Sequence, residues 1–317
     1  MKSQSVTAPS LTKKRYTFFT DIRRNRFSYL LILPALLYVL VFSYLSYPYM
    51  IIAFKHFNYK LGVFGSEWCG FKNFEFFLKS TNAPTVIRNT LVLNILFIVT
   101  GTLTSLVLAI LLNELRSRVF VRTAQTMMLF PHYISWVVVS YILLAIFSNK
   151  NGLANQLLNA LGMKSVSWYT KADAWPTILV WMKIWKSAGM NAVIYLAAIT
   201  GIDESIYESA TIDGANRFQR IVSITVPLIM PTVCIMTLLA VGKIMNGDFG
   251  MIYALVGDQG ILYETTDVID TYVYRVLRQT GDPSQSMAIG LFQSLIGLVM
   301  VGSNWIVKHT FHEGALF

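Results

Sequence analysis

Long apolar stretches alternate with shorter polar ones along this chain of 317 residues. A helix needs roughly 20 mostly apolar residues to cross a hydrocarbon core about 30 Å thick. Six stretches reach that length, and they cover residues 27–54, 90–112, 124–147, 174–200, 224–245 and 287–307. The pattern therefore predicts an all-α integral membrane protein with six transmembrane helices. Polar tails over residues 1–26 and 308–317 flank these stretches.

The composition supports a membrane protein and argues against a soluble domain. Hydrophobic residues make up 55% of the chain and charged residues 13%, whereas about a quarter of the residues in a soluble domain are charged. A formal net charge of +10 would suggest a nucleic-acid or acidic partner in a soluble protein. Here the cations flank apolar spans, so their distribution indicates the orientation of the chain in the membrane. We predict contact with lipid and no nucleic-acid partner.

Lys and Arg residues near the span ends predict the orientation, because short cytoplasmic segments are enriched in them. The distribution favours cytoplasmic N- and C-termini, with a modest bias, since residues 55–79 on the opposite side also carry lysines. The cations assigned to the cytoplasm are Lys13, Lys14, Arg15, Arg23, Arg24, Arg26, Arg116, Arg118, Arg122, Arg217, Arg220 and Lys308. This orientation places the connection over residues 201–226 in the cytoplasm.

The connections assigned to the outer side, residues 55–89, 148–173 and 246–286, are the longer ones. The last of them contains apolar residues at helical spacing. These residues are Val268, Ile269, Tyr272, Val273, Val276 and Leu277. Two interpretations fit this pattern: a surface helix that lies beside the membrane, and a docking surface for an external partner.

The cytoplasmic connection over residues 201–226 has the signals of two short helices. Asp203 and Ser205 are favourable N-cap residues for a first helix, and Gly214 permits the left-handed turn that ends it. Apolar positions inside this helix, such as Ile206 and Ala210, predict one apolar stripe. A second short helix is expected to begin near Asn216 and to run until Pro227.

The same connection resembles the E-A-A loop of bacterial ABC import permeases. That consensus reads E-A-A, then G, nine residues, and I-x-L-P; here the chain has Glu208-Ser209-Ala210, Gly214, Ile224 and Val226-Pro227, with Ser for Ala and Val for Leu. In that family the loop forms a coupling helix that sits in a cleft of a cytoplasmic ATPase subunit. The resemblance implies that Glu208, Ser209, Ala210, Asp213, Gly214, Ala215 and Pro227 couple the chain to an ATPase and catalyse nothing.

The resemblance extends over most of the chain. The segments at residues 29–39, 111–114, 131–135 and 267–275 look like the subgroup that imports complex oligosaccharides such as alginate or pectin fragments. It implies a type I importer architecture, with an ABC transmembrane type-1 core over residues 87–307, in a bacterial cytoplasmic membrane. It also implies a second homologous permease, two ATPase subunits that use ATP-Mg, an extracytoplasmic solute-binding protein and an oligosaccharide substrate.

No catalytic motif accompanies the predicted spans. The sequence lacks the phosphate-binding pattern G-x-x-x-x-G-K-[ST], and it also lacks H-E-x-x-H and G-x-S-x-G. The two cysteines, Cys69 and Cys234, do not suggest a metal site. We therefore predict that the chain is not an enzyme, that it binds no cofactor or metal itself, and that another subunit hydrolyses ATP.

Polar residues inside the spans are candidates for a substrate path, because a charge in hydrocarbon costs at least ~2.5 kcal/mol. Lys183 and Lys186 are three residues apart and share one helix face. The full candidate set is Lys183, Lys186, Asn191, Tyr195, Lys243 and Asn246. As a hypothesis, the lysines favour an acidic, uronic-acid-containing sugar, and Trp136, Trp181 and Trp185 offer faces for pyranose rings. Alternatively, the lysines snorkel and the tryptophans form an interfacial belt.

Two further function classes remain open beside the importer. A secondary transporter or channel would need no ATPase, and its transport would survive loss of the loop over residues 201–226. A structural scaffold would need no polar residues inside its spans. The loop favours the importer, in which we expect ATP-driven alternating access.

Overall fold

The computed structural model describes residues 22–149 and 151–311, so residues 1–21 of the predicted N-terminal tail and residues 312–317 of the C-terminal tail lie outside the described residues. The chain divides into the units Met1–Ile51 and Ile52–Phe317. Both are built from helices, which confirms the predicted all-α class. In the described part of the chain, the only sheet is the antiparallel pair of β1 (Lys55–His56) and β2 (Glu67–Trp68).

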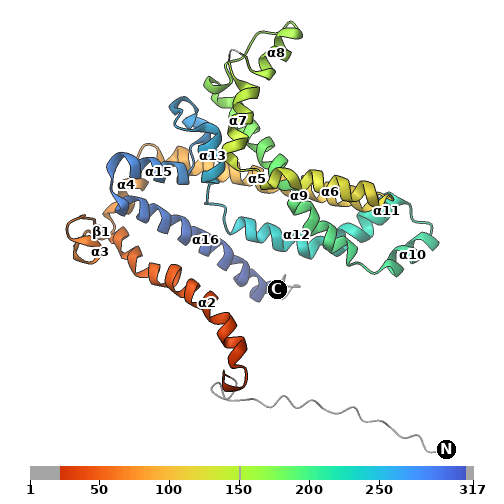
Figure 1. The fold of residues 1–317 in the computed structure, drawn as a ribbon, viewed down its shortest axis with the longest axis horizontal. Helices are drawn as coiled ribbons and strands as arrows, with labels where there is room; N and C mark the ends of the chain where they lie inside the picture. The colour runs from red at the N-terminus through yellow and green to blue at the C-terminus, as the bar shows by residue number, and fades with distance from the viewer. Residues whose placement is uncertain (1–21, 150, 312–317) are drawn as a thin grey trace, which may run out of the picture. The chain divides into compact units, whose positions relative to one another are not determined.

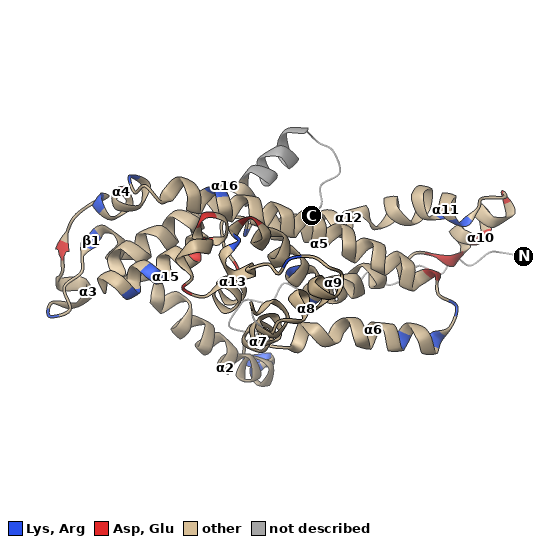
Figure 2. Cartoon of the chain, turned by 90° about the horizontal axis from the view of Figure 1, so that it is seen from above, with Lys and Arg blue, Asp and Glu red and all other residues tan. Residues whose placement is uncertain are grey.

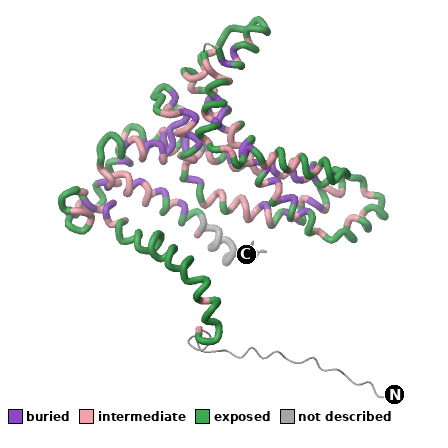
Figure 3. Tube along the Cα trace, viewed as in Figure 1, coloured by how far each residue is buried: buried purple, intermediate pink, exposed green. Residues whose placement is uncertain are grey.

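The first unit contains an apolar helix with no buried residue. Helix α2 (Arg26–Phe42) is followed by the 3₁₀ helix η1 (Tyr44–Phe54), and together they are long and apolar enough to cross a membrane. The side chains of α2 are exposed along its length, as Figure 3 shows. A helix that is apolar all round and unburied suits contact with lipid.

The second unit is built around long helices that pack side by side (Figure 1). They are α5 (Ala83–Glu114), α6 (Arg118–Tyr133), α9 (Trp175–Thr200), α12 (Val226–Val241) and α16 (Pro283–Phe311). Prolines occupy the first turns of α5 and α9, where the missing N–H needs no helical partner. Helix α9 lies at the centre, since it packs on α5, α6 and α12.

Buried apolar side chains hold these helices together in three clusters. One surrounds Trp175 and Leu179 on α9 and includes residues of α5 and of the outer helix α13 (Phe249–Val256). A second joins α4 (Lys72–Leu78), α5, α16 and α15 (Ile269–Thr280). The third joins α5, α9 and α12 near Ala109 and Tyr195. The clusters lie one after another along α5. Both ends of this helix are therefore packed against neighbouring helices.

Gly189 marks the closest approach between α6 and α9. A Cβ atom at this position would collide with the backbone carbonyl of Met128 on α6. Only a residue without a side chain lets the two backbones come so close. The packing of α6 against α9 therefore depends on this glycine.

The third predicted span is broken, so the prediction of one continuous helix over residues 124–147 is wrong. Helix α6 ends at Tyr133, and α7 (Trp136–Phe147) leaves it at an angle of 96°. Ser135 caps α7 by accepting a hydrogen bond from the Val138 N–H at 3.3 Å. The long apolar stretch suggested one helix, although Pro131 and the cap Ser135 are local signals of a break.

The other predicted spans are all helical, with shifted ends. Helices α5 and α16 are longer than predicted, and α12 ends at Val241 rather than at residue 245. Among the described residues, Arg26–Phe54, Ala83–Glu114 and Arg217–Val241 are long and apolar enough to cross a membrane, and the bent pair α6–α7 is a fourth candidate. Helices α9 and α16 are not among these candidates, so a total of six spans stays a prediction.

The predicted outer connections contain short helices. They are α3 (Gly62–Gly65) and α4, then α8 (Leu153–Ala160), η2 (Trp168–Thr170) and η3 (Ala172–Ala174), then α13, η5 (Gly260–Leu262), α14 (Tyr263–Thr266) and α15. The predicted helix over the apolar residues at 268–277 is confirmed as α15. Its buried residues Ile269, Tyr272 and Val276 pack on the second unit's core, while a docking role stays a prediction.

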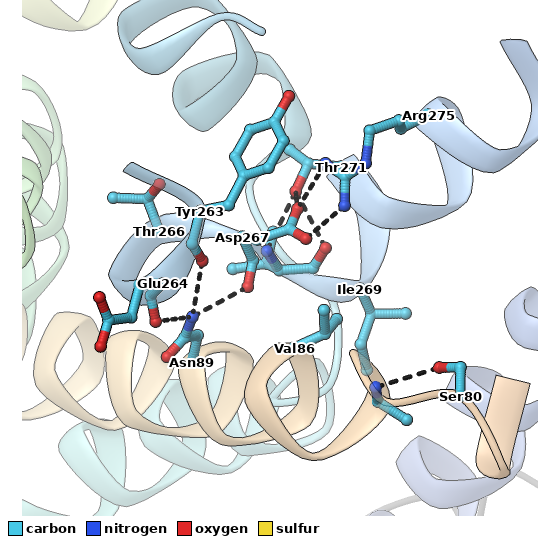
Figure 4. Close-up of polar contacts among 12 residues, drawn as sticks. Ser80, Val86, Asn89, Tyr263, Glu264, Thr266, Asp267, Ile269, Thr271 and Arg275 are labelled. Carbon is cyan, nitrogen blue, oxygen red and sulfur yellow. Dashed lines mark hydrogen bonds and ion pairs between the residues drawn. The ribbon is translucent and has the colours of Figure 1, made fainter. Parts of the chain in front are cut away.

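A polar network fixes α14 and α15 to the N-terminal end of α5 (Figure 4). Asn89 on α5 donates to the carbonyls of Tyr263, Glu264 and Asp267 at 3.4, 3.0 and 3.3 Å. The Arg275 guanidinium binds both carboxylate oxygens of Asp267. Such bidentate pairs hold their groups in one orientation. The network therefore fixes the positions of α14 and α15 relative to α5.

Candidate functional site

The connection over residues 201–226, predicted to be cytoplasmic, contains a short capped helix, α10 (Glu204–Ile212). As predicted, Asp203 is the N-cap: its carboxylate accepts the Ser205 N–H at 3.0 Å. This hydrogen bond lowers the pKa of the Asp203 carboxyl below its ordinary value. The charged carboxylate also interacts favourably with the helix N-terminus, so local sequence alone stabilises the start of α10.

Gly214 ends α10, also as predicted, through a left-handed residue with φ of +80°. The Ala215 N–H donates to the Ala210 carbonyl at 2.9 Å and the Gly214 N–H to the Thr211 carbonyl at 3.1 Å. These two bonds form a Schellman turn, which satisfies the last carbonyls of a helix. Because residues with a Cβ rarely adopt this φ, the glycine fixes where the helix ends.

Helix α10 presents nearly its whole surface to solvent. Glu208 and Asp213 are exposed and neither carboxylate has an ion-pair partner among the described residues. Ile212, 86% exposed, and Phe218, 73% exposed, lie in the same connection. Unpaired acids beside large exposed apolar side chains are typical of a surface that another protein covers.

The second predicted helix begins as expected but does not stop at Pro227. Asn216 and Gln219 form a capping box, with hydrogen bonds of 2.8 and 2.9 Å to each other's backbone N–H groups. Helix α11 (Arg217–Arg220) then continues through the π-helical turn η4 (Ile221–Thr225) into α12. Pro227 therefore lies inside one helical segment, where the wider turn before it accommodates a residue that lacks an N–H.

Positive charge gathers at this end of the second unit. The ends of α5 and α9 lie beside α10 and α11, since they line one cavity together. Arg116, Arg118 and Arg122 follow the end of α5, and Arg217 and Arg220 belong to α11. Figure 2 shows charged residues at this end and few along the middle of α5 and α12. This distribution fits the predicted cytoplasmic side.

Lys186, a predicted substrate-path residue, holds the bend between α6 and α7. Its side chain is buried, and its Nζ donates to the carbonyls of Pro131 at 3.2 Å, of His132 at 2.8 Å and of Ile134. The ring centroid of Trp136 lies 5.2 Å from the same Nζ. A cation near the last carbonyls of a helix satisfies them and interacts well with the helix dipole.

The connection after α12, over residues 242–248, is not α-helical. It nevertheless packs beside Asn94, a residue of the predicted second span. Asn94 donates to the carbonyls of Ile244 at 2.9 Å and Asn246 at 3.1 Å. Gln293 on α16 donates to the Met245 carbonyl at 3.0 Å. Backbone of this kind is tolerated at membrane depth only where protein covers it or where it lines an aqueous cavity.

Two carboxylates complete the support of this connection. Asp270 on α15 accepts the Gly247 N–H, and a Cβ on Gly247 would collide with Val268. Asp248 forms an ion pair with Lys183 at 2.7 Å. Sequence reasoning assigned no role to Asn94, Asp270 or Gln293, because each is a single polar residue in an apolar or amphipathic segment.

The six candidate path residues therefore occupy different environments. Lys183 and Lys186 have partners, and Tyr195 is 2% exposed in the α5–α9–α12 cluster. Asn191 is half-buried, whereas Lys243 and Asn246 are exposed on the connection after α12. Of the three tryptophans, Trp136 is half-buried, and Trp181 and Trp185 are 63% and 42% exposed. The structure brings Lys186 and Trp136 together, and it does not gather the whole set around one cavity.

Comparisons with known proteins identify the family. Residues 101–309 match the model of the binding-protein-dependent transport system inner membrane component family. The chain is 36% identical to protein LplB of Bacillus subtilis strain 168, over 97% of this chain and 96% of that protein. It is 32% identical to the polygalacturonan/rhamnogalacturonan transport system permease protein YteP of the same strain, over 99% of both.

Solved structures agree with the sequence comparisons. The chain resembles a crystal structure of a bacterial ABC transporter involved in the import of the acidic polysaccharide alginate, with a TM-score of 0.83, 33% identity and coverage of 92% of this chain and 98% of that chain. A structure of a bacterial alginate ABC transporter in complex with an alginate pentasaccharide-bound periplasmic protein matches with a TM-score of 0.84 and 32% identity. The chain therefore belongs to the binding-protein-dependent transport system inner membrane component family, as a permease subunit and not an enzyme.

Proposed function

We propose that this chain is the permease subunit of an ABC importer that moves an acidic oligosaccharide across the cytoplasmic membrane. Support comes from the family match, from relatives named for polygalacturonan and alginate transport, and from the exposed helix α10. Its expected partners are a second, homologous permease, two ATPase subunits that use ATP-Mg, and an extracytoplasmic solute-binding protein. The arginines around α10 favour a cytoplasmic location for that helix and, with it, for both chain termini.

The observation that carries this proposal is the surface of α10. Glu208, Asp213 and Ile212 project from a helix that its own caps hold in place. Acids and an exposed isoleucine suit a groove that has an apolar floor and basic groups at its rim. In this proposal the ATPase subunits close on ATP and push α10, and the helices that follow it turn between inward- and outward-open states.

A charge-removing variant tests whether Glu208 contacts the ATPase. We expect Glu208→Ala in the complete importer to reduce co-purification of the ATPase, and transport, roughly tenfold, because a charged pair across an interface contributes on the order of 1.5 kcal/mol or more. The measurement is the ATPase-to-permease ratio after affinity purification of the complex. Glu204→Ala, which removes the same charge from the first turn of α10, is the matched control.

The result for Glu208→Ala separates the importer from its main alternative. If both variants retain the ATPase and transport at the wild-type level, α10 is not the coupling surface. A secondary transporter or channel that works without an ATPase would then explain transport better.

For the substrate path we propose Lys243 and Asn246 as the residues that meet the sugar. Both side chains are exposed on the non-helical connection, whereas Lys183 is neutralised by Asp248 and the ammonium of Lys186 is occupied by carbonyls. The described residues provide no ion-pair partner for Lys243. An exposed lysine at the level of an apolar span faces water or another subunit more favourably than lipid.

Lys243→Gln is expected to change substrate preference. Loss of one charge-assisted hydrogen bond should lower uptake of uronic-acid oligosaccharides roughly fivefold relative to neutral ones. Uptake of both sugar classes into proteoliposomes that contain the whole importer measures this ratio. Lys60→Gln, another exposed lysine on the outer side, should leave the ratio unchanged, and an equal loss for both sugars with Lys243→Gln would refute the assignment.

A further inference from the structure

Helix α10 has one aromatic side chain, Tyr207, that faces the long helices of the second unit. Within α10, only Tyr207 and Ala210 are shielded from solvent, and they lie three residues apart on one face. No other helix packs extensively on α10. Tyr207 is the larger of the two and carries a hydroxyl, so it is the main side-chain link between α10 and the long helices.

The Tyr207 hydroxyl is bonded to the π-helical turn before α12. Its Oη lies 2.9 Å from Oγ1 of Thr225, the last residue of η4, and Thr225 is 3% exposed. The Thr225 hydroxyl in turn lies 3.5 Å from the carbonyl of Arg220 at the start of the turn. When the threonine donates to this carbonyl, the tyrosine donates to the threonine, which gives every hydroxyl hydrogen an acceptor.

A second bond ties the other end of α10 to the last residue of α11, just before this turn. The Arg220 guanidinium donates to Oγ1 of Thr211 at 3.0 Å. The two contacts therefore meet residues at opposite ends of η4, Arg220 before it and Thr225 at its end; in such a turn an extra residue widens the helix, and helices frequently carry functional irregularities there. The turn lies directly between α10 and the predicted fifth span, so any displacement of α10 reaches that span through it.

Space beside Tyr207 leaves α10 free of other constraints. A cavity of about 350 Å³ separates it from the ends of α5 and α9, and Glu114, Thr200 and Ile202 line the walls. A helix packed tightly on α5 and α9 would transmit a push to all three long helices at once. With this gap, the side-chain contacts of α10 are made with Thr225 and Arg220 on the segment that leads into α12, whereas α9 meets α10 through the chain connection at residues 201–203.

We propose that Tyr207 and Thr225 form a latch that transmits movement of α10 to α12 during transport. This inference rests on the proposed coupling role of α10 and adds the route by which the movement reaches the membrane. Both are positioning residues: they contact neither the substrate nor ATP. Breaking the latch leaves the ATPase-facing surface of Glu208, Asp213 and Ile212 unchanged and reduces the transport obtained from each ATP.

The test compares Tyr207→Phe and Thr225→Val in the complete importer, with Thr225→Ser as the control that retains the hydroxyl. We expect each single variant to keep the ATPase at the wild-type ratio and to hydrolyse ATP, but to transport roughly fivefold fewer substrate molecules per ATP, consistent with loss of one net hydrogen bond. The double variant should be no worse than either single variant, because both remove the same contact. Thr225→Ser should transport normally.

The outcomes separate this inference from the proposal it rests on. Unchanged transport per ATP in both single variants, or additive losses in the double variant, would overturn the latch. Loss of the ATPase from Tyr207→Phe would also overturn it, by placing Tyr207 in the docking surface. A failure of the proposed coupling role appears elsewhere, as Glu208→Ala complexes that keep both the ATPase and transport.

Discussion

Lys186→Met is expected to destabilise the permease strongly and to reduce its assembly into the importer. The buried ammonium donates to three carbonyls at the end of α6 and in the bend. Methionine has a similar length but no donor, so the carbonyls of His132 and Ile134 lose this donor, while the Pro131 carbonyl keeps the Ile134 N–H. A buried polar group left without a partner costs about 1–3 kcal/mol, and the total loss should reach about 3 kcal/mol or more. The measurement is the thermal unfolding midpoint of the detergent-solubilised complex.

Lys183→Met provides the matched control on the same helix. Its ammonium is partly exposed and pairs with Asp248, so water can replace the lost contact and the effect on unfolding should be much smaller. Equal unfolding midpoints for wild type and Lys186→Met, together with reduced uptake of acidic sugar alone, would contradict the structural role. They would favour the sequence-based hypothesis that Lys186 meets the substrate.

Gly189→Ala is the second substitution expected to have a large effect. The new methyl group would overlap the Met128 carbonyl, so α6 and α9 must move apart. Overpacking of this kind costs roughly 1–3 kcal/mol, and here it also disturbs the bend that Lys186 stabilises. We expect a lower unfolding midpoint and a smaller yield of assembled importer.

Gly101→Ala in α5 tests the specificity of that effect. Nothing lies within 4 Å of a Cβ at Gly101, and alanine is a better helix former than glycine by roughly 1 kcal/mol. This variant should be as stable as wild type or more stable. A similar loss for both glycines would contradict the close α6–α9 contact as the cause of the effect.

Local sequence signals predicted the caps of the connection over residues 201–226 well, because its short helices are stabilised by their own neighbours. Asp203, Gly214 and the Asn216–Gln219 pair take part in hydrogen bonds between residues at most five positions apart. Such capping patterns can be read without knowing the fold. The continuation of α11 through Pro227 was missed, because a π-helical turn has no simple sequence pattern.

The direction of the bend between α6 and α7 could not be predicted from the local pattern. Pro131 and Ser135 signal a break, but the support of the bend comes from Lys186, more than 50 positions away. The same holds for the connection after α12, which Asn94 and Gln293 hold from two other helices. Two of the predicted path lysines, Lys183 and Lys186, also bind groups that are distant in the sequence. The sequence shows that a lysine is present in a span, but it does not show which carbonyl or carboxylate that lysine contacts.

The resemblance to oligosaccharide importers predicted more of the protein's function than any single motif did. The family was confirmed over residues 101–309, and the helical class followed from the apolar pattern. Substrate contacts stay a proposal, since the path of a type I importer is expected to lie between two permeases. Of the six candidate residues, Lys243 and Asn246 are the two whose side chains are exposed, so we propose these two as the substrate contacts.

The most direct test of the central claim is photocrosslinking from α10 in the intact importer. A benzoylphenylalanine placed at Ile212, whose side chain is 86% exposed, should form an adduct with the ATPase subunit. The same group at Leu161, 75% exposed after α8, should not. An ATPase adduct from Ile212 alone is the result we predict; adducts from both positions, or none from Ile212 in a complex that retains its ATPase, would contradict the coupling role of α10.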